Sequence, residues 1–155
     1  MKQCLFLVAT LFFNLLSYSQ EKIMPDPRER AKSGFIEYGG NGLIASINYD
    51  ARFLKTQDGF GYRIGLGAVL TDVFRARAGL TIPIGLNYLA GKKSHFFESG
   101  LGLTIDVDAG EVIFVPSIGY RYQPLHNGFT FRIFASPLIR HSSIFWAGLS
   151  FGYKF

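Results

Sequence analysis

His141 and Ser143 come nearest to a catalytic arrangement in this chain, because a histidine can act as general base toward a serine hydroxyl. Residues two apart share one face of an extended strand, so the two side chains could meet. A hydrolytic triad also needs a carboxylate to orient the histidine. The sequence has no Asp or Glu after Glu111. The segment therefore fits a polar loop better than a hydrolytic site, and we expect no catalytic residues.

Three carboxylates between Asp106 and Glu111 are the next candidate, as ligands for a divalent cation. Their spacing is not that of a calcium loop, and the simpler prediction is a solvated tight turn with Asp106 facing inward. His95 and His126 are too far apart in sequence to argue for a shared metal. We expect no metal site and no cofactor.

The elements that would position these residues are strands. From about residue 35 onward, apolar and small or polar residues alternate with period two, and turn signals separate the segments. We predict strands near 43–54, 60–70, 76–89, 96–107, 112–123, 129–138 and 144–155, with a shorter one near 34–39. The short segment could also belong to one long strand kinked at its glycines. Pro83 predicts a bulge or another local irregularity, because proline removes a ladder hydrogen bond.

Within these strands one face carries large apolar side chains and the other carries glycine and charge. The charged residues on the glycine-bearing face are Asp50, Arg52, Arg63, Glu98, Asp106, Arg121, Arg132 and Lys154. A soluble barrel or sandwich would turn the apolar face inward, whereas a membrane barrel turns it toward lipid. Glycine only weakens a strand on a water-exposed face, but small residues suit the crowded interior of a small closed barrel. We therefore predict an antiparallel transmembrane up-and-down β-barrel whose lumenal charges pair with one another.

Aromatic residues are predicted to gather at one end of this barrel. If the last strand runs toward the periplasm, every strand has an aromatic at its periplasmic end, which would form a girdle at one membrane interface. The predicted girdle comprises Tyr49, Phe53, Phe60, Tyr62, Tyr88, Phe96, Phe97, Tyr120, Tyr122, Phe129, Phe131, Tyr153 and Phe155. Termini on the same side require an even number of strands. At about ten residues per tilted strand, the chain has room for eight.

The first residues predict export. Lys2, an apolar run and a small-x-small site at Ser17–Ser19 are typical of a cleaved signal peptide over residues 1–19. Residues 20–33 are charged, contain Pro25 and Pro27, and predict a flexible periplasmic lead-in, so the barrel is predicted to cover 34–155. The one cysteine falls in the signal, which excludes disulfides and thiolate chemistry from the mature chain. The net charge of +5 favours a negatively charged membrane surface as partner over nucleic acid.

These features resemble a family, the small eight-stranded outer-membrane β-barrel proteins of Gram-negative bacteria. The resemblance rests on YGGNGLIASINYDARF (38–53), TIPIGLNYLAGKKSHFFESGLGL (81–103), GYRYQP (119–124) and WAGLSFGYKF (146–155). It implies location in the outer membrane, contact with lipid and lipopolysaccharide, and assembly by the barrel assembly machinery. It further implies that Leu149, Phe151, Tyr153 and Phe155 form the signal read by that machinery.

Two further readings stay open beside a non-enzymatic envelope protein, for which we expect a monomer with a structural or surface-interaction role. The His-x-Ser spacing at 141–143 is similar to that of outer-membrane lipid A deacylases, although Ile144 stands where that family has Asn. The other reading is a secreted, soluble lipocalin-like barrel. The predicted outer loops near 71–75, 107–111 and 138–143 are short, which argues against a large receptor surface.

Overall fold

The protein is an all-β chain whose computed structural model describes residues 30–72, 77–139 and 143–155. The strands are β1 (Lys32–Gly39), β2 (Ala45–Arg52), β3 (Gly59–Asp72), β4 (Arg77–Lys92), β5 (His95–Asp106), β6 (Glu111–Tyr122), β7 (Gly128–Ala135), β8 (Leu138–Ile139), β9 (Ser143–Ile144) and β10 (Ala147–Lys154). A short 3₁₀ turn, η1 (Gly40–Gly42), joins β1 to β2. Among the described residues, no helix is long and apolar enough to cross a membrane.

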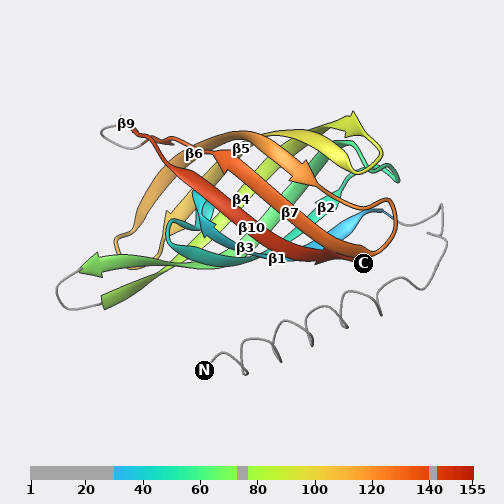
Figure 1. Ribbon diagram of the computed structural model, residues 1–155. Helices are drawn as coiled ribbons and strands as arrows, with labels where there is room; N and C mark the ends of the chain where they lie inside the picture. Colours follow the sequence, from blue (N-terminus) through green and yellow to red (C-terminus); the bar gives the residue numbers. More distant parts are fainter. Residues whose placement is uncertain (1–29, 73–76, 140–142) are drawn as a thin grey trace, which may run out of the picture.

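Eight of these strands close into an antiparallel barrel (Figure 1). Successive strands from β1 to β7 pair with one another, β10 pairs with β7, and β1 completes the ring by pairing with β10 from Ser33–Lys154 to Gly39–Gly148. The prediction of an eight-stranded up-and-down barrel is confirmed. The short first segment is a separate strand, and it begins at Lys32, two residues before the predicted start of the barrel.

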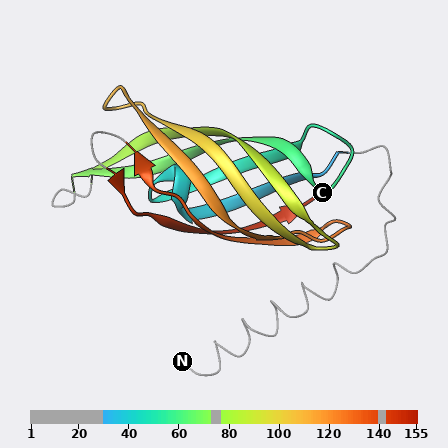
Figure 2. The ribbon, with the colours of Figure 1, turned by 90° about the horizontal axis from the view of Figure 1, so that it is seen from above.

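The barrel has two unlike ends, visible from two directions in Figures 1 and 2. We call one the terminal end, because Lys32 and Phe155 lie there with the connections at 53–58, 93–94 and 123–127. The other, the far end, carries the β5–β6 turn at 107–110 and the outer part of the long β3–β4 pair.

Polarity across the wall is the reverse of that in a soluble protein. Large apolar side chains on the outside are widely exposed, such as Ile47 at 69% and Leu66 at 61%. Charged side chains on the inside are closed off, with Asp50 and Arg121 each 1% exposed. The soluble lipocalin-like reading is wrong, since a water-soluble barrel would place its apolar side chains inside.

Pro83 interrupts the pairing of β3 with β4. The ladder has no pairs between Ile64–Ile84 and Gly67–Thr81, and it resumes in the same register. The predicted local irregularity is therefore present, but not as a bulge, because the one register shift in this ladder falls between Leu70 and Asp72. Proline lacks the N–H that the ladder needs. On its other side, Pro83 remains aligned with Thr104 of β5.

The connection between β1 and β2 does not project from the far end but turns into the barrel. Gly40, Asn41 and Gly42 are all buried. This inward turn contacts β3, β4, β5, β6 and β10 as well as β1. Beside it, Leu43 forms an apolar cluster with Ile113, Val115, Val69 and Leu138. An apolar cluster thus lies beside the inward turn, and most of the buried charged side chains lie nearer the terminal end.

Candidate functional site: the filled barrel interior

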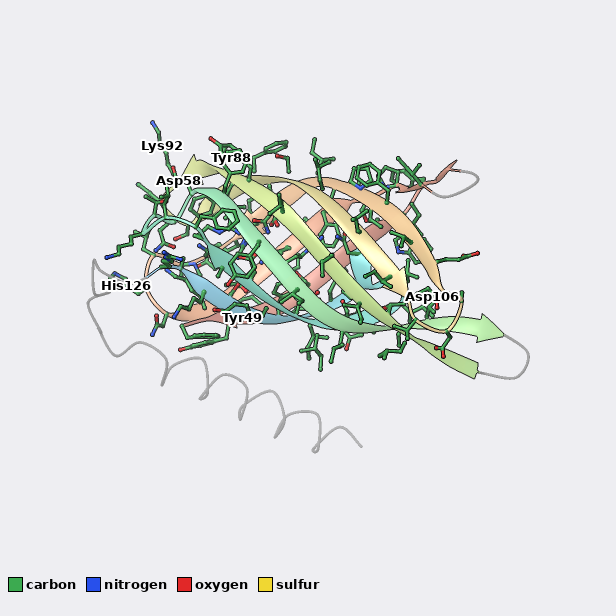
Figure 3. All side chains as sticks on the ribbon, turned by 180° about the vertical axis from the view of Figure 1, so that it is seen from behind. Tyr49, Asp58, Tyr88, Lys92, Asp106 and His126 are labelled. Atoms are coloured by element: carbon green, nitrogen blue, oxygen red, sulfur yellow. The ribbon has the colours of Figure 1, made fainter. Side chains whose placement is uncertain are left out.

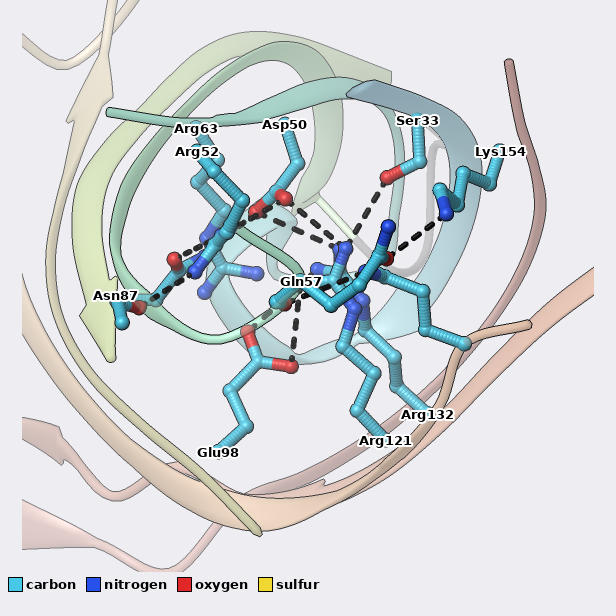
Figure 4. A network of polar contacts seen from close by, with 12 residues as sticks. Ser33, Asp50, Arg52, Gln57, Arg63, Asn87, Glu98, Arg121, Arg132 and Lys154 are labelled. Carbon is cyan, nitrogen blue, oxygen red and sulfur yellow. Dashed lines mark hydrogen bonds and ion pairs between the residues drawn. The ribbon is translucent and has the colours of Figure 1, made fainter. Parts of the chain in front are cut away.

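Asp50 of β2 is the centre of the ionic half of the lumen (Figure 4). Its Oδ1 accepts hydrogen bonds of 2.9 Å from Nη2 of Arg52 and of Arg121. Its Oδ2 accepts one of 2.6 Å from the Asn87 amide nitrogen and lies 3.5 Å from Nη2 of Arg132. One carboxylate therefore ties β2 to strands β4, β6 and β7 across the interior.

Two arginines from neighbouring strands share a second carboxylate. Arg121 and Arg132 are directly opposite in the β6–β7 register, so their guanidinium groups would repel one another unless anions separated them. Glu98 of β5 supplies one, at 3.8 Å from Arg121 Nη1 and 3.7 Å from Arg132 Nη1. The Arg132 guanidinium also lies 3.9 Å from the centre of the Phe35 ring, a cation–π contact.

Glu37 connects this ionic network to the inward turn. Its Oε2 pairs with Nη1 of Arg63 at 3.0 Å. Its Oε1 accepts hydrogen bonds from the backbone N–H of Asn41 at 2.9 Å and of Gly42 at 3.3 Å. The side chain is fully buried. A buried carboxylate with an arginine and two amide donors is well compensated, so Glu37 holds the turn inside the barrel.

Lys154 closes the mouth at the terminal end. Its Nζ donates to Gln57 Oε1 at 2.8 Å and to the carbonyl oxygens of Pro124 at 3.0 Å and Leu125 at 2.7 Å. Gln57 also accepts from the Gln123 amide at 3.0 Å. The β2–β3 and β6–β7 connections are thereby fastened together across the opening.

We expect Lys154→Met to release these two connections. Hydrogen bonds that involve a charged group contribute about 1.5–3 kcal/mol, so the loss should be about 2 kcal/mol of unfolding free energy. Limited proteolysis at 53–58 and 123–127 should become faster in the variant. Lys55→Met, an exposed lysine in the same β2–β3 connection, should leave both the stability and the cleavage rate unchanged. Equal protection in the two variants would contradict the assigned role.

All eight charged residues singled out from the sequence lie buried on the inner face. Seven of them gather in the ionic network around Asp50 and at the mouth that Lys154 closes. Asp106 lies apart at the far end (Figure 3). Its Oδ1 accepts from the backbone N–H of Asp108 at 3.1 Å and of Ala109 at 3.0 Å.

The carboxylates at 106–111 therefore build a turn. Asp108 Oδ2 also accepts a backbone hydrogen bond, of 2.8 Å from the N–H of Leu80. Within the described part of the chain, no three His, Cys, Asp or Glu side chains gather closely enough to hold a metal ion. His95 lies on the outer surface, where its Nδ1 is 2.6 Å from the Tyr120 hydroxyl oxygen.

The aromatic residues singled out from the sequence surround the terminal end, with one exception. Rings of neighbouring strands approach each other, as in Phe60–Tyr88 at 4.8 Å and Phe53–Tyr62 at 5.6 Å between centroids. The rings of Tyr49 and Phe155 are 6.4 Å apart across β1, which lies between β2 and β10. Figure 3 shows Tyr49 and Tyr88 near the same end as Asp58, Lys92 and His126. Phe96 does not belong to this belt. It is 2% exposed and points inward, because adjacent residues of a strand face opposite sides.

The remaining residues singled out from the sequence are Leu149, Phe151, Tyr153, Phe155, His141 and Ser143. The first four lie exposed on the outside of the barrel, along β10 and just beyond it. His141 lies outside the described residues, and only the backbone of Ser143 is described, as part of β9. The described residues therefore do not include the side-chain arrangement of His141 and Ser143.

Several contributors to the interior were missed in the sequence, among them Glu37, Asn87 and Gln57. Glu37 falls in the short first strand, whose existence was in doubt, although its alternation with Ser33 and Phe35 was a usable signal. Asn87 was not among the residues singled out, yet it bonds both Asp50 and Arg52. Gln57 lies in a connection, where strand alternation gives no indication of direction.

Comparison with known proteins adds little to this description. No protein-family model matches the chain, and no curated protein matches its sequence. Among solved structures, the N-terminal β-barrel domain of Pseudomonas aeruginosa OprF is similar at 16% identity and a TM-score of 0.49, over 81% of this chain and 96% of that one. The architecture described above therefore stands on the strand pairing of this chain.

Proposed function

We propose that this protein is a small, non-enzymatic barrel of the bacterial outer membrane with a structural role in the envelope. The observation that carries the proposal is the reversed polarity of the wall, with exposed Ile47 and Leu66 outside and buried Asp50 and Arg121 inside. Only a solvent as apolar as lipid makes that exterior favourable. A closed β-barrel is one of the two structures, with the α-helix, that can satisfy their backbone hydrogen bonds internally within a bilayer.

The terminal end faces the periplasm in this proposal. The belt of aromatic rings around that end marks it as a membrane–water interface, because Tyr and Trp side chains favour both interfaces of a membrane. That this interface is the periplasmic one is part of the proposal. The Tyr49 ring lies 6.4 Å from the rings of both Tyr62 and Phe155, its neighbours in that belt. The far end then faces outward, with the short β5–β6 turn at 107–110 and the outer part of the β3–β4 pair.

The filled lumen supports a structural role over transport. The inward turn with the adjoining apolar cluster around Leu43, and the network around Asp50, fill the interior of the barrel. An eight-stranded barrel is only just wide enough for its own side chains. Solutes would have to displace buried ion pairs to pass, so we expect no steady conductance from the protein in planar bilayers.

The test is a fold measurement in detergent together with fractionation. The unheated protein should migrate differently from the boiled protein on a gel, show strand-rich circular dichroism, and appear in the outer-membrane fraction. Recovery in the aqueous fraction without detergent would disprove the membrane placement. Mass spectrometry of lipid A from cells with and without the protein tests the non-enzymatic role separately. A loss of acyl chains that disappears in His141→Ala would favour the deacylase reading instead.

A further inference from the structure

The outer face of the β4–β5 hairpin carries a continuous file of side chains from the middle of the barrel to the terminal end. In the register of the two strands, Ile84 is opposite Leu103 and Leu86 is opposite Leu101. Further toward the terminal end come three more outward pairs, Tyr88–Ser99, Ala90–Phe97 and Lys92–His95. The file is apolar at its inner end and basic at the turn.

A groove hollows the inner part of this file. It has a volume of about 550 Å³ and a predominantly apolar lining that includes Tyr62, Ile64, Ile84, Leu86, Leu101 and Phe114. These side chains come from strands β3 to β6 and face outward. The groove therefore opens toward the lipid phase rather than toward the lumen.

The spacing between groove and turn matches one leaflet of a bilayer. Lys92 lies six positions beyond Leu86, which is about 20 Å along a strand at roughly 3.3 Å per residue. With a typical strand tilt of about 40°, this corresponds to about 15 Å along the membrane normal. Half of a hydrocarbon core of ~30 Å is the same depth. A lipid whose headgroup lies at Lys92 would thus place its chain end in the groove.

The turn itself is strongly basic. Lys92 and Lys93 are both exposed, and Figure 3 shows Lys92 extended away from the barrel. Glu98, the carboxylate nearest along β5, points into the lumen. Among the described residues around the terminal end, the exposed basic side chains outnumber the exposed side-chain carboxylates. The basic residues are Arg30, Lys32, Lys55, Lys92 and Lys93, and the carboxylate is Asp58. Complementary charge therefore favours an anionic headgroup over a zwitterionic one.

Lys93 adopts a backbone conformation that is unfavourable for lysine. Its φ is 58°, in the left-handed region that glycine and asparagine adopt most readily. The next residue of the turn, Ser94, is uncharged, so the positive charge of this turn comes from the consecutive lysines 92 and 93. The lysine at 93 thus carries a conformational cost that glycine would remove.

We propose that the β4–β5 hairpin binds one anionic phospholipid of the periplasmic leaflet. The phosphate lies between Lys92 and Lys93, and an acyl chain runs over the small side chains of Ala90 and Ser99 into the groove at Leu86 and Leu101. This inference rests on the membrane placement proposed above.

The test is native mass spectrometry of protein released from nanodiscs that contain phosphatidylcholine with a minor share of phosphatidylglycerol. The wild type should retain phosphatidylglycerol in excess of its share. Lys92→Gln/Lys93→Gln should lose that excess, by roughly fivefold for each lysine removed. Lys32→Gln/Lys55→Gln, an equal charge change elsewhere at the terminal end, should keep it. Leu101→Trp, which fills the groove, should lower retention of both lipids.

Lys93→Gly separates a lipid role from a structural one. It should stabilise the turn yet reduce phosphatidylglycerol retention, whereas a purely structural lysine would leave retention unchanged. Soluble glycerol phosphate should not compete, and competition would reduce the site to one for a free anion and overturn the proposal. Equal retention of the two lipids by the wild type, or full retention by Lys92→Gln/Lys93→Gln, would also overturn it. Heat-modifiable migration of every variant shows that the barrel itself has formed, so failure of the lipid site is distinguishable from failure of the membrane barrel.

Discussion

Asp50→Ala is expected to lower the free energy of unfolding by about 3–5 kcal/mol, the usual loss when one partner of a buried ion pair is removed. Asp50 accepts from Arg52, Arg121 and Asn87 and lies 3.5 Å from Arg132. Without it, the cations of the network would retain only Glu37 and Glu98 as carboxylate partners among the described residues. Urea unfolding in detergent micelles or vesicles, followed by the heat-modifiable band, measures the loss.

Two companion variants make this expectation specific. Asp50→Asn keeps an acceptor for Arg52 or Arg121 but removes the charge, so its loss should be intermediate. Asp58→Ala removes a carboxylate from an exposed position in the β2–β3 connection and should change stability by no more than about 0.5 kcal/mol. If Asp50→Ala were as stable as Asp58→Ala, the network would contribute nothing to the fold.

Glu37→Ala should have the second largest effect, because one side chain holds both Arg63 and the inward turn. We expect a loss of about 3 kcal/mol, since a buried guanidinium loses its carboxylate and two backbone N–H groups lose their acceptor. Hydrogen exchange at the amides of Asn41 and Gly42 should accelerate at least tenfold. Exchange is the decisive readout, because it reports on the turn rather than on overall stability.

Glu37→Gln and Ser150→Ala are the matched controls. The glutamine retains an acceptor oxygen for the turn amides, so exchange should stay slow although Arg63 loses its counter-charge. Ser150 is buried on the inner face of β10, and its Oγ has no hydrogen-bond partner among the described residues, so its removal should change neither quantity. Slow exchange at Asn41 and Gly42 in Glu37→Ala would show that the turn is held by other contacts.

Much of this fold could be predicted from the sequence, because a membrane-type wall enforces strict alternation. Each residue of the wall faces either the outside of the barrel or its lumen, so a period of two along 76–89 or 112–123 specifies both the strand and its orientation. The same rule placed Arg121, Arg132 and Lys154 inside. The alternation and the alternating strand directions together also predicted the end of the barrel at which the aromatic rings collect.

The interior was harder to predict, because packing across a lumen leaves no local signal. Phe35, Phe134, Ile113 and Val115 are apolar yet point inward. Their positions in the alternation place them on the inner face, but the expectation that inner-face residues are small or polar does not hold for them. Phe134 fits because Gly40 and Gly148 leave room for its ring, and a Cβ at either glycine would lie 2.5 Å from it.

The inward turn shows the same limit. Asn41-Gly42 predicts a tight turn between two strands, which is present, but turn chemistry does not specify whether the loop points into water or into the lumen. Its direction follows from partners distant in sequence, such as Glu37 with Arg63 and the Thr104 hydroxyl, which donates to the Asn41 carbonyl oxygen. Such contacts become visible only when the ring of strands has closed.

The lumenal contacts also have a consequence for the kinetics of this protein. Asp50 and Arg121 are 71 residues apart in sequence, Gln57 and Lys154 are 97 apart, and Leu43 and Trp146 are 103 apart. Contacts between such distant segments slow folding, because the chain loses loop entropy before the contacts form. They also join opposite walls, so no hairpin can leave without breaking bonds to the others. We expect slow assembly followed by a single, concerted unfolding transition, in which the barrel resists heat as one cooperative unit until the whole ring opens.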